Sequence, residues 1–281
     1  MILSKSTVLS VTSRGFLTAI GSVLLLASPV RADDPDTSIF GQKTQSAAAL
    51  MGVLYDLKQT QDHQPTGMDP DNYNHVVDAF LSKGWDESVF EAFYQVSRPL
   101  YTTQIFVPNM DAATAPEAFG AAQTVKPRLW IIHYKGQVSA PETGTYRFWG
   151  AADDACDVAV NGKTVLVANR YDTRTPHMDA TWQTTAPKGA QAADDPLIAG
   201  SWMDLKAGEI IDLDVIIGER PGGQFNAFLV IEKQGATYPM DGQGHPIFPI
   251  FQVAPYDTPE LKDIGREPLF SKGYPIWKSY Q

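Results

Sequence analysis

Residues 130–162, WIIHYKGQVSAPETGTYRFWGAADDACDVAVNG, decide the fold of this 281-residue chain. The stretch holds three segments rich in β-branched and aromatic residues, and short turn signals separate them. One turn signal is the run Pro141-Glu142-Thr143-Gly144. The other is Asn161-Gly162, the dipeptide that most strongly predicts a two-residue β-hairpin turn. We therefore predict antiparallel strands over residues 130–138, 146–149 and 156–160, with a return strand over 164–168.

The third of these segments shows the alternation expected of a strand. Cys156, Val158 and Val160 alternate with Asp157 and Ala159. Successive side chains of a strand point to opposite faces, so this pattern predicts a strand with one buried face. We expect Cys156 to fill the core on that face.

Similar strand signals extend to both sides of this stretch. They recur at intervals of about 8–12 residues with turns between them, which is typical of a β-sandwich or barrel. We predict a mainly β fold, an antiparallel β-sandwich with a small helical insertion over about residues 59–125, after the first strand. The other predicted strands cover residues 48–57, 101–107, 202–205, 210–217, 227–232 and 247–253, and the predicted helices cover 72–83 and 87–94.

Five short motifs occur in a characteristic order between residues 130 and 231. Together they resemble the protective-antigen N-terminal domain family, β-sandwich modules called PA-fourteen domains that occur in flocculin adhesins and as insertions in glycosidases. One position differs, because Ala155 stands where the family has a glycine, which can adopt a positive φ more readily. The motifs are Lys135-Gly136-Gln137-Val138, Gly144-Thr145-Tyr146-Arg147-Phe148, Asp153-Asp154, Asn161-Gly162 and Leu205-Lys206-Ala207-Gly208.

The resemblance implies a role for the paired acids Asp153 and Asp154. In sugar-binding members of the family such a pair holds Ca²⁺, which bridges to sugar hydroxyls. It also implies that Asn226 or Gln224, from the glycine-rich loop, completes the set of oxygen ligands that Ca²⁺ requires. The alternative is that both carboxylates accept hydrogen bonds from main-chain amides and brace the hairpin without a metal.

A long loop over residues 169–201 contains a second group of candidate residues. Arg170, Tyr171 and Trp182 combine ring faces with hydrogen-bond donors, a combination that suits sugar binding. Loops of this length inside a compact domain are usually functional or disordered. The alternative is a surface excursion in which Trp182 packs onto the core.

The N-terminus predicts export. Residues 1–32 combine basic residues, a short apolar run and small residues at their end, which is the pattern of a cleavable signal peptide with cleavage near Ala32. The apolar run is too short to span a bilayer, so we expect a secreted or periplasmic protein. We expect a linker over 33–46, the sandwich over 47–255 and an extended tail over 256–281.

Composition excludes several classes of partner. Without the signal peptide, 19 basic and 32 acidic residues remain, a net charge of −13. That charge argues against binding to nucleic acid or to anionic lipid, and no later segment predicts a membrane span. The single cysteine and the absence of an Asn-x-Ser/Thr sequon favour a bacterial origin.

The function predicted from these features is that of an exported, non-catalytic module that binds a glycan or a cell-envelope polysaccharide, as an adhesion protein does. No motif of a catalytic nucleophile or of a phosphate-binding loop is present. Two alternatives remain: a structural or protein–protein interaction domain of the cell envelope, and an accessory domain of a glycoside hydrolase.

Overall fold

The computed structural model describes residues 36–182, 191–192, 195–255, 270–271 and 274–280. The predicted signal peptide lies outside the described residues. Within the described ranges, none of the helices combines the length and the apolar character needed to cross a bilayer.

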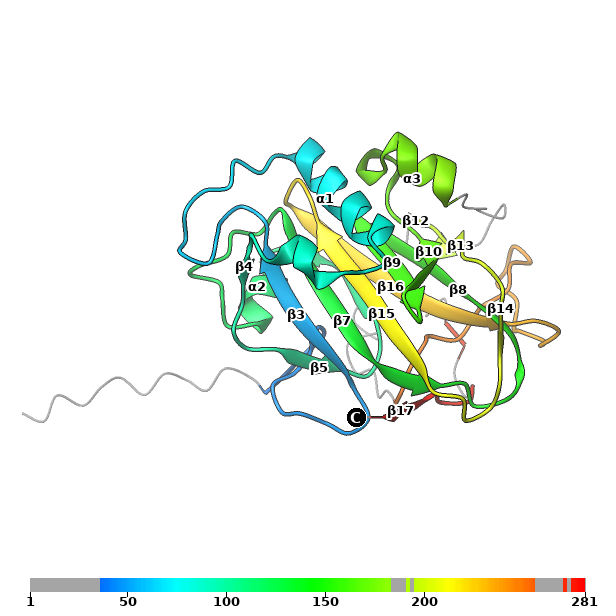
Figure 1. Ribbon diagram of the computed structural model, residues 1–281. Helices are drawn as coiled ribbons and strands as arrows, with labels where there is room; N and C mark the ends of the chain where they lie inside the picture. The colour runs from blue at the N-terminus through cyan, green and yellow to red at the C-terminus, as the bar shows by residue number, and fades with distance from the viewer. Residues whose placement is uncertain (1–35, 183–190, 193–194, 256–269, 272–273, 281) are drawn as a thin grey trace, which may run out of the picture. The chain divides into compact units, whose positions relative to one another are not determined.

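Two antiparallel sheets form a sandwich, so the predicted fold class is confirmed (Figure 1). The large sheet has the order β1-β2-β5-β3-β7-β15-β9-β10, with β4 paired to β3 and β17 paired to β7. Its strands are β1 (Thr37–Ser38), β2 (Gly41–Gln42), β3 (Leu50–Asp56), β4 (Tyr94–Gln95), β5 (Leu100–Thr102), β7 (Trp130–Ser139), β9 (Ala155–Val160), β10 (Lys163–Val167), β15 (Ile211–Glu219) and β17 (Lys278–Tyr280).

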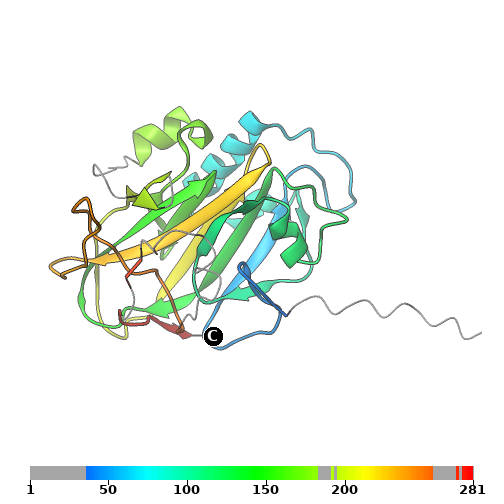
Figure 2. The ribbon, with the colours of Figure 1, turned by 180° about the vertical axis from the view of Figure 1, so that it is seen from behind.

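The smaller sheet has the order β13-β8-β16-β6, with β14 paired to β8. Figure 2 shows its long strand β16 in yellow from behind. Its strands are β6 (Phe106–Asp111), β8 (Gly144–Asp153), β13 (Ile198–Ala199), β14 (Met203–Leu205) and β16 (Gln224–Lys233), and a separate short hairpin pairs β11 (Gln191–Ala192) with β12 (Asp195–Pro196).

The main core lies between the two sheets. Phe148 of β8 and Leu229 of β16 meet Ile132 of β7, Cys156 of β9 and Leu213 of β15 there, all fully buried. The prediction that Cys156 fills the core is confirmed.

A second apolar cluster covers the outer face of the large sheet. Helix α1 (Pro70–Ser82) lies over this face (Figure 1). Its buried side chains Tyr73, Val77 and Phe80 pack against Ile131 and Ile216 of the sheet. The 3₁₀ helix η1 (Glu87–Phe90) and helix α3 (Pro176–Thr181) lie on the same layer and contribute Phe90 and Met178. The remaining helices are α2 (Thr114–Ala118) and the 3₁₀ helix η2 (Tyr171–Thr173).

The observed fold corrects two expectations. The strand β9 is buried on both faces, and Asp157 is fully buried, because the helical layer covers the face that alternation alone leaves to solvent. The insertion over 59–125 is also only partly helical, since it contributes β4 and β5 to the large sheet and β6 to the small one.

The prediction of a linker over 33–46 is also corrected for the residues of it that the structure describes. Residues from Thr37 to Gln42 form the β1–β2 hairpin, and Gln42 pairs with Tyr101 of β5. Phe40 is buried in the main core, where its ring stacks on Phe225 at 6.2 Å between centroids. An apolar side chain in the hairpin loop therefore fixes this segment to the sandwich. Among the described residues of the predicted C-terminal tail, Phe270 packs against Phe106, and β17 pairs with β7.

A buried histidine joins the insertion to the large sheet. His133 of β7 places Nδ1 3.0 Å from Glu87 Oε1 and Nε2 2.8 Å from Asp214 Oδ1. Lys135 holds the same Glu87 carboxylate with its Nζ at 2.7 Å. Burial alone lowers the pKa of His133, but the two carboxylates outweigh that effect, and the net shift is upward.

Replacing His133 with glutamine is expected to destabilise the fold more at pH 6 than at pH 9. A histidine whose pKa is raised in the folded state contributes stability that is complete below its unfolded pKa of about 6.5. That stability is lost as pH rises through the folded-state pKa. The loss at pH 6 should be about 1.5–3 kcal/mol, the usual size for hydrogen bonds to charged groups. Thermal melts at both pH values measure it, with the exposed His75→Gln as control. An equal loss at both pH values would contradict the charged-histidine account.

Candidate functional site

The paired acids lie where the chain passes from β8 of the small sheet to β9 of the large sheet. Asp153 ends β8, Asp154 follows through a cis peptide bond, and β9 begins at the next residue. The register of β8 with β16 places Asn226 directly opposite Asp153. Glu219 ends β15, and the turn to β16 carries Gly222 and Gly223. Two acids, one amide and a glycine-rich turn therefore meet at one end of the sandwich.

Asp154 is fully buried and only partly hydrogen-bonded. Its Oδ2 accepts a hydrogen bond from the main-chain N–H of Arg220 at 2.8 Å. Its Oδ1 has no hydrogen-bond partner among the described residues. Burial, together with the neighbouring charge of Asp153, raises the pKa of Asp154 to about 7. A buried carboxylate oxygen without a donor is a place where a cation would be stabilised.

Arg170 supplies the positive charge nearest to the pair. Its Nη1 donates to Asp153 Oδ1 at 2.5 Å and lies 3.8 Å from Asp154 Oδ1. Its main-chain N–H donates to the carbonyl of Asp154 at 2.8 Å, which fixes the start of the long loop against the pair. The side chain is 41% exposed, so the guanidinium reaches the acids from the solvent side.

Two residues beside the pair were not predicted from the sequence. Glu219 is buried, and its Oε1 accepts from the N–H of Gly222 at 2.6 Å. Burial and the charge of Asp154 raise the pKa of Glu219 to about 8. Arg220 links the turn to the long loop, because its Nη2 donates to Asp172 Oδ2 at 2.8 Å. The sequence signal was an acid and an arginine at the end of a strand, immediately before a glycine-rich turn.

The other predicted site residues divide into two groups. Tyr171 is 82% exposed, and its ring centroid lies 5.9 Å from the guanidinium of Arg170, so it lies beside the pair. Gln224 is exposed on β16, two residues before Asn226. Trp182 instead packs against the helical layer, where its ring meets His177 at 5.8 Å. The placement of Trp182 matches the alternative in which it packs onto the core.

The described part of the long loop contains short helices. It carries η2 and α3, and Thr175 caps α3 by accepting from the N–H of Met178. Residues 183–190 and 193–194 of the loop lie outside the described residues.

The side-chain oxygen atoms at this end of the sandwich are of the kind that a hard cation binds, but few of them are charged. The described part of the chain contains no group of three or more His, Cys, Asp or Glu side chains arranged to hold a metal ion. A cation here would therefore need Asp153, Asp154, the amide oxygen of Asn226 and main-chain carbonyls. Ca²⁺ accepts such mixed oxygen sets with about six to eight ligands.

One protein-family model matches part of the chain. The family model described as the PA14 domain matches residues 108–195. No curated protein sequence matches the chain.

Similar solved structures include three adhesin or antifreeze domains. A PA14 sugar-binding domain from an RTX adhesin is 15% identical, covers 73% of this chain and 96% of its own, and has a TM-score of 0.41. The PA14 domain of the antifreeze protein MpAFP is 16% identical, with coverages of 69% and 87% and a TM-score of 0.40. The A domain of epithelial adhesin 6 from Candida glabrata, in complex with Galb1-3GlcNAc, is 13% identical, with coverages of 76% and 95% and a TM-score of 0.38.

The family match spans β6 to β12 and contains both paired acids. The resemblance seen in the sequence is thus confirmed, because residues 108–195 match the model of the PA14 domain family.

Proposed function

We propose that this protein is an exported, non-catalytic module that binds a glycan through a calcium ion held at the Asp153–Asp154 end of the sandwich. The observation that carries the proposal is the meeting of Asp153, Asp154 and Asn226 within or beside the PA14 match, with one buried carboxylate oxygen of Asp154 lacking a donor.

Asp153, Asp154 and Asn226 would hold the cation through their side-chain oxygens. When bound, Ca²⁺ supplies direct coordination to neighbouring hydroxyls of a sugar. Burial of Asp154 keeps water away from one side of the site, and the two neighbouring acids both lie at the end of β8.

Tyr171 and Arg170 would form the outer part of the site. The exposed ring of Tyr171 offers a flat apolar face on which a sugar ring can pack. Arg170 carries guanidinium donors for hydroxyl oxygens once its contact with Asp153 is released. Gln224 and Asn226, on the strand after the glycine-rich turn, would add amide groups that read hydroxyl orientation.

A structural role is the second candidate, and Arg170 favours it. The guanidinium pairs with Asp153, while Asp154 accepts from the N–H of Arg220, so both acids already have partners that brace the strand end. In that case the cation is dispensable, and the same surface serves as a contact for another envelope protein.

Glycan-array binding in calcium and in EDTA distinguishes the two functions. The proposal expects binding to at least one glycan class in 2 mM calcium, and a loss of at least tenfold in EDTA and in Asp154→Asn. Asp71→Asn, an exposed acid at the start of α1, is the matched control and should bind as the native protein does.

Binding that survives both EDTA and Asp154→Asn would remove the metal from the proposal. Absence of glycan binding in calcium, together with an unchanged melting temperature at millimolar calcium, would leave the bracing role. A ligand that binds the native state alone must raise the melting temperature by mass action.

A further inference from the structure

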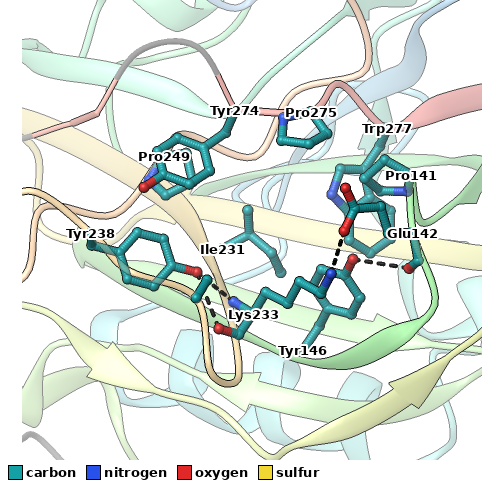
Figure 3. Close-up of a pocket in the computed structure, with 11 residues that line it drawn as sticks. Pro141, Glu142, Tyr146, Ile231, Lys233, Tyr238, Pro249, Tyr274, Pro275 and Trp277 are labelled. Carbon is teal, nitrogen blue, oxygen red and sulfur yellow. Dashed lines mark hydrogen bonds and ion pairs between the residues drawn. The ribbon is translucent and has the colours of Figure 1, made fainter.

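A cavity lies at the opposite end of β8 and β16 from the paired acids. It has a volume of about 210 Å³ and lies over the ends of β8 and β16 that carry Tyr146 and Lys233 (Figure 3). The register pairs Lys233 with Tyr146 and Asn226 with Asp153, seven residues apart on each strand. At about 3.3 Å per residue the cavity is about 23 Å from the paired acids, so it is a separate site.

Aromatic rings and prolines form most of its walls. Figure 3 shows Tyr238 and Tyr274 on one side, Tyr146 and Trp277 on the other, and Ile231 between them. The rings of Tyr238 and Tyr274 stack with centroids 5.4 Å apart, while Tyr146 and Trp277 meet edge to face at 5.5 Å. Three prolines complete the lining. Two largely apolar walls therefore face each other across the cavity.

The C-terminal segment contributes one aromatic ring to each of these walls. Tyr274 and Trp277 belong to residues 274–280, which dock onto the sandwich through β17. The N–H of Trp277 donates to the carbonyl of Gln252 at 3.0 Å, and the hydroxyl of Tyr274 donates to the carbonyl of Thr237 at 2.9 Å. Main-chain carbonyls thus hold the backbone of Trp277 and the hydroxyl of Tyr274.

One ion pair supplies the polar part of the cavity. Lys233 crosses the cavity and pairs its Nζ with Glu142 Oε2 (Figure 3). The two side chains are 31% and 57% exposed, so both remain within reach of a ligand. An ammonium group has three donors and a carboxylate about four acceptor positions, so each retains hydrogen-bonding capacity after pairing.

These features define the ligand's chemistry. The charges of Lys233 and Glu142 cancel, so a charged ligand gains little. A wholly apolar ligand would cover the ion pair without replacing its water, which costs free energy. A neutral ring with an apolar face and hydroxyl groups on its edge meets both demands, because it packs between the walls and bonds to Lys233 and Glu142.

We infer that this cavity is a second sugar subsite, which takes one neutral pyranose ring without a metal ion. The volume lies below the roughly 300–1,000 Å³ of pockets for drug-sized ligands, which suits a single ring. The inference is independent of the calcium site, since no residue is shared between them. Together they would let one sandwich contact a glycan, or two glycans, at opposite ends.

Saturation-transfer NMR in EDTA tests this inference with three probes: methyl β-D-glucopyranoside, methyl β-D-galactopyranoside and methyl α-D-mannopyranoside. At least one should bind, and should bind equally to Asp154→Asn, because the metal site takes no part. Tyr274→Ala and Lys233→Met should each weaken that binding at least tenfold. Tyr280→Ala is the matched control, a tyrosine of the same segment outside the cavity, and should have no effect.

Absence of binding by all three glycosides in EDTA would overturn the inference and leave the calcium-dependent proposal untouched. Loss of binding in Asp154→Asn would also overturn it, by assigning the probe to the other end. Equal binding by Tyr274→Ala, Lys233→Met and Tyr280→Ala would exclude the cavity. If Tyr274→Ala melts at a lower temperature, Lys233→Met, which keeps the wall intact, decides. Binding of a proline decapeptide to the cavity, without binding of any of the glycosides, would assign the cavity to a peptide. It would contradict the inference that the cavity binds a sugar.

Discussion

Asp157→Asn is expected to raise the melting temperature by about 5 °C or more at pH 8.5 and to change it little at pH 4. Asp157 is fully buried under the helical layer, and neither carboxylate oxygen makes a well-formed hydrogen bond to a described residue. Burial raises the pKa of Asp157 to about 8, against smaller lowering effects of Asn169 and Arg174. The native state therefore holds a proton that the unfolded chain releases at much lower pH.

The sign of this effect follows from linkage. A carboxyl with a raised folded-state pKa gives stability that is complete below its unfolded pKa of about 3.9 and is lost as pH rises to the folded value. Asparagine resembles the protonated acid and cannot ionise, so it removes the loss at high pH. A gain of ~2 kcal/mol corresponds to about 4–8 °C for a protein of this size.

Thermal melts of both proteins at pH 4 and pH 8.5 measure the effect. Asp62→Asn, an exposed acid in the loop after β3, is the matched control and should shift the melting temperature by less than about 1 °C at either pH. An Asp157→Asn protein no more stable than the native one at pH 8.5 would show that Asp157 is ionised and paired inside the fold.

Asp157 also shows what local sequence pattern can reveal. Alternation in β9 identified a strand and the correct core face, because Cys156 and Val158 enter the main core. The alternation also predicted that the other face of β9 is exposed to solvent. No local signal shows that Tyr73 and Val77, about 80 residues earlier, cover that face. The same limit applies to Phe40, one apolar residue in a polar stretch that is buried by contacts with distant strands.

The candidate site divides in the same way. The neighbours Asp153 and Asp154 were visible in the sequence, and the register of β8 with β16 brings Asn226 opposite Asp153. The placement of Arg170 against the acids depends on the start of a long loop, and that of Trp182 on docking with the helical layer. Neither placement follows from spacing, because both are set by packing between segments remote in the chain.

Arg170→Gln is expected to raise the affinity for calcium about tenfold or more. The guanidinium lies 2.5 Å from Asp153 Oδ1 and 3.8 Å from Asp154 Oδ1, where its charge repels a divalent cation and must withdraw before the cation binds. Two charges a few ångströms apart near a protein surface interact by several kcal/mol, and exposure of Arg170 reduces this to the ~1.4 kcal/mol of a tenfold change. Glutamine removes the charge and keeps a shorter, polar side chain.

Isothermal titration with calcium at constant ionic strength measures this change, beside the same titration of Asp154→Asn, in which binding should be lost. Arg98→Gln removes a positive charge from an exposed residue before β5 and should leave the affinity within twofold, which separates the local effect from that of net charge. If Arg170→Gln binds calcium no more tightly than the native protein, the guanidinium does not compete for the site. If it binds none and also melts at a lower temperature, Arg170 is a structural partner of the acids, and the bracing role explains the pair without a metal.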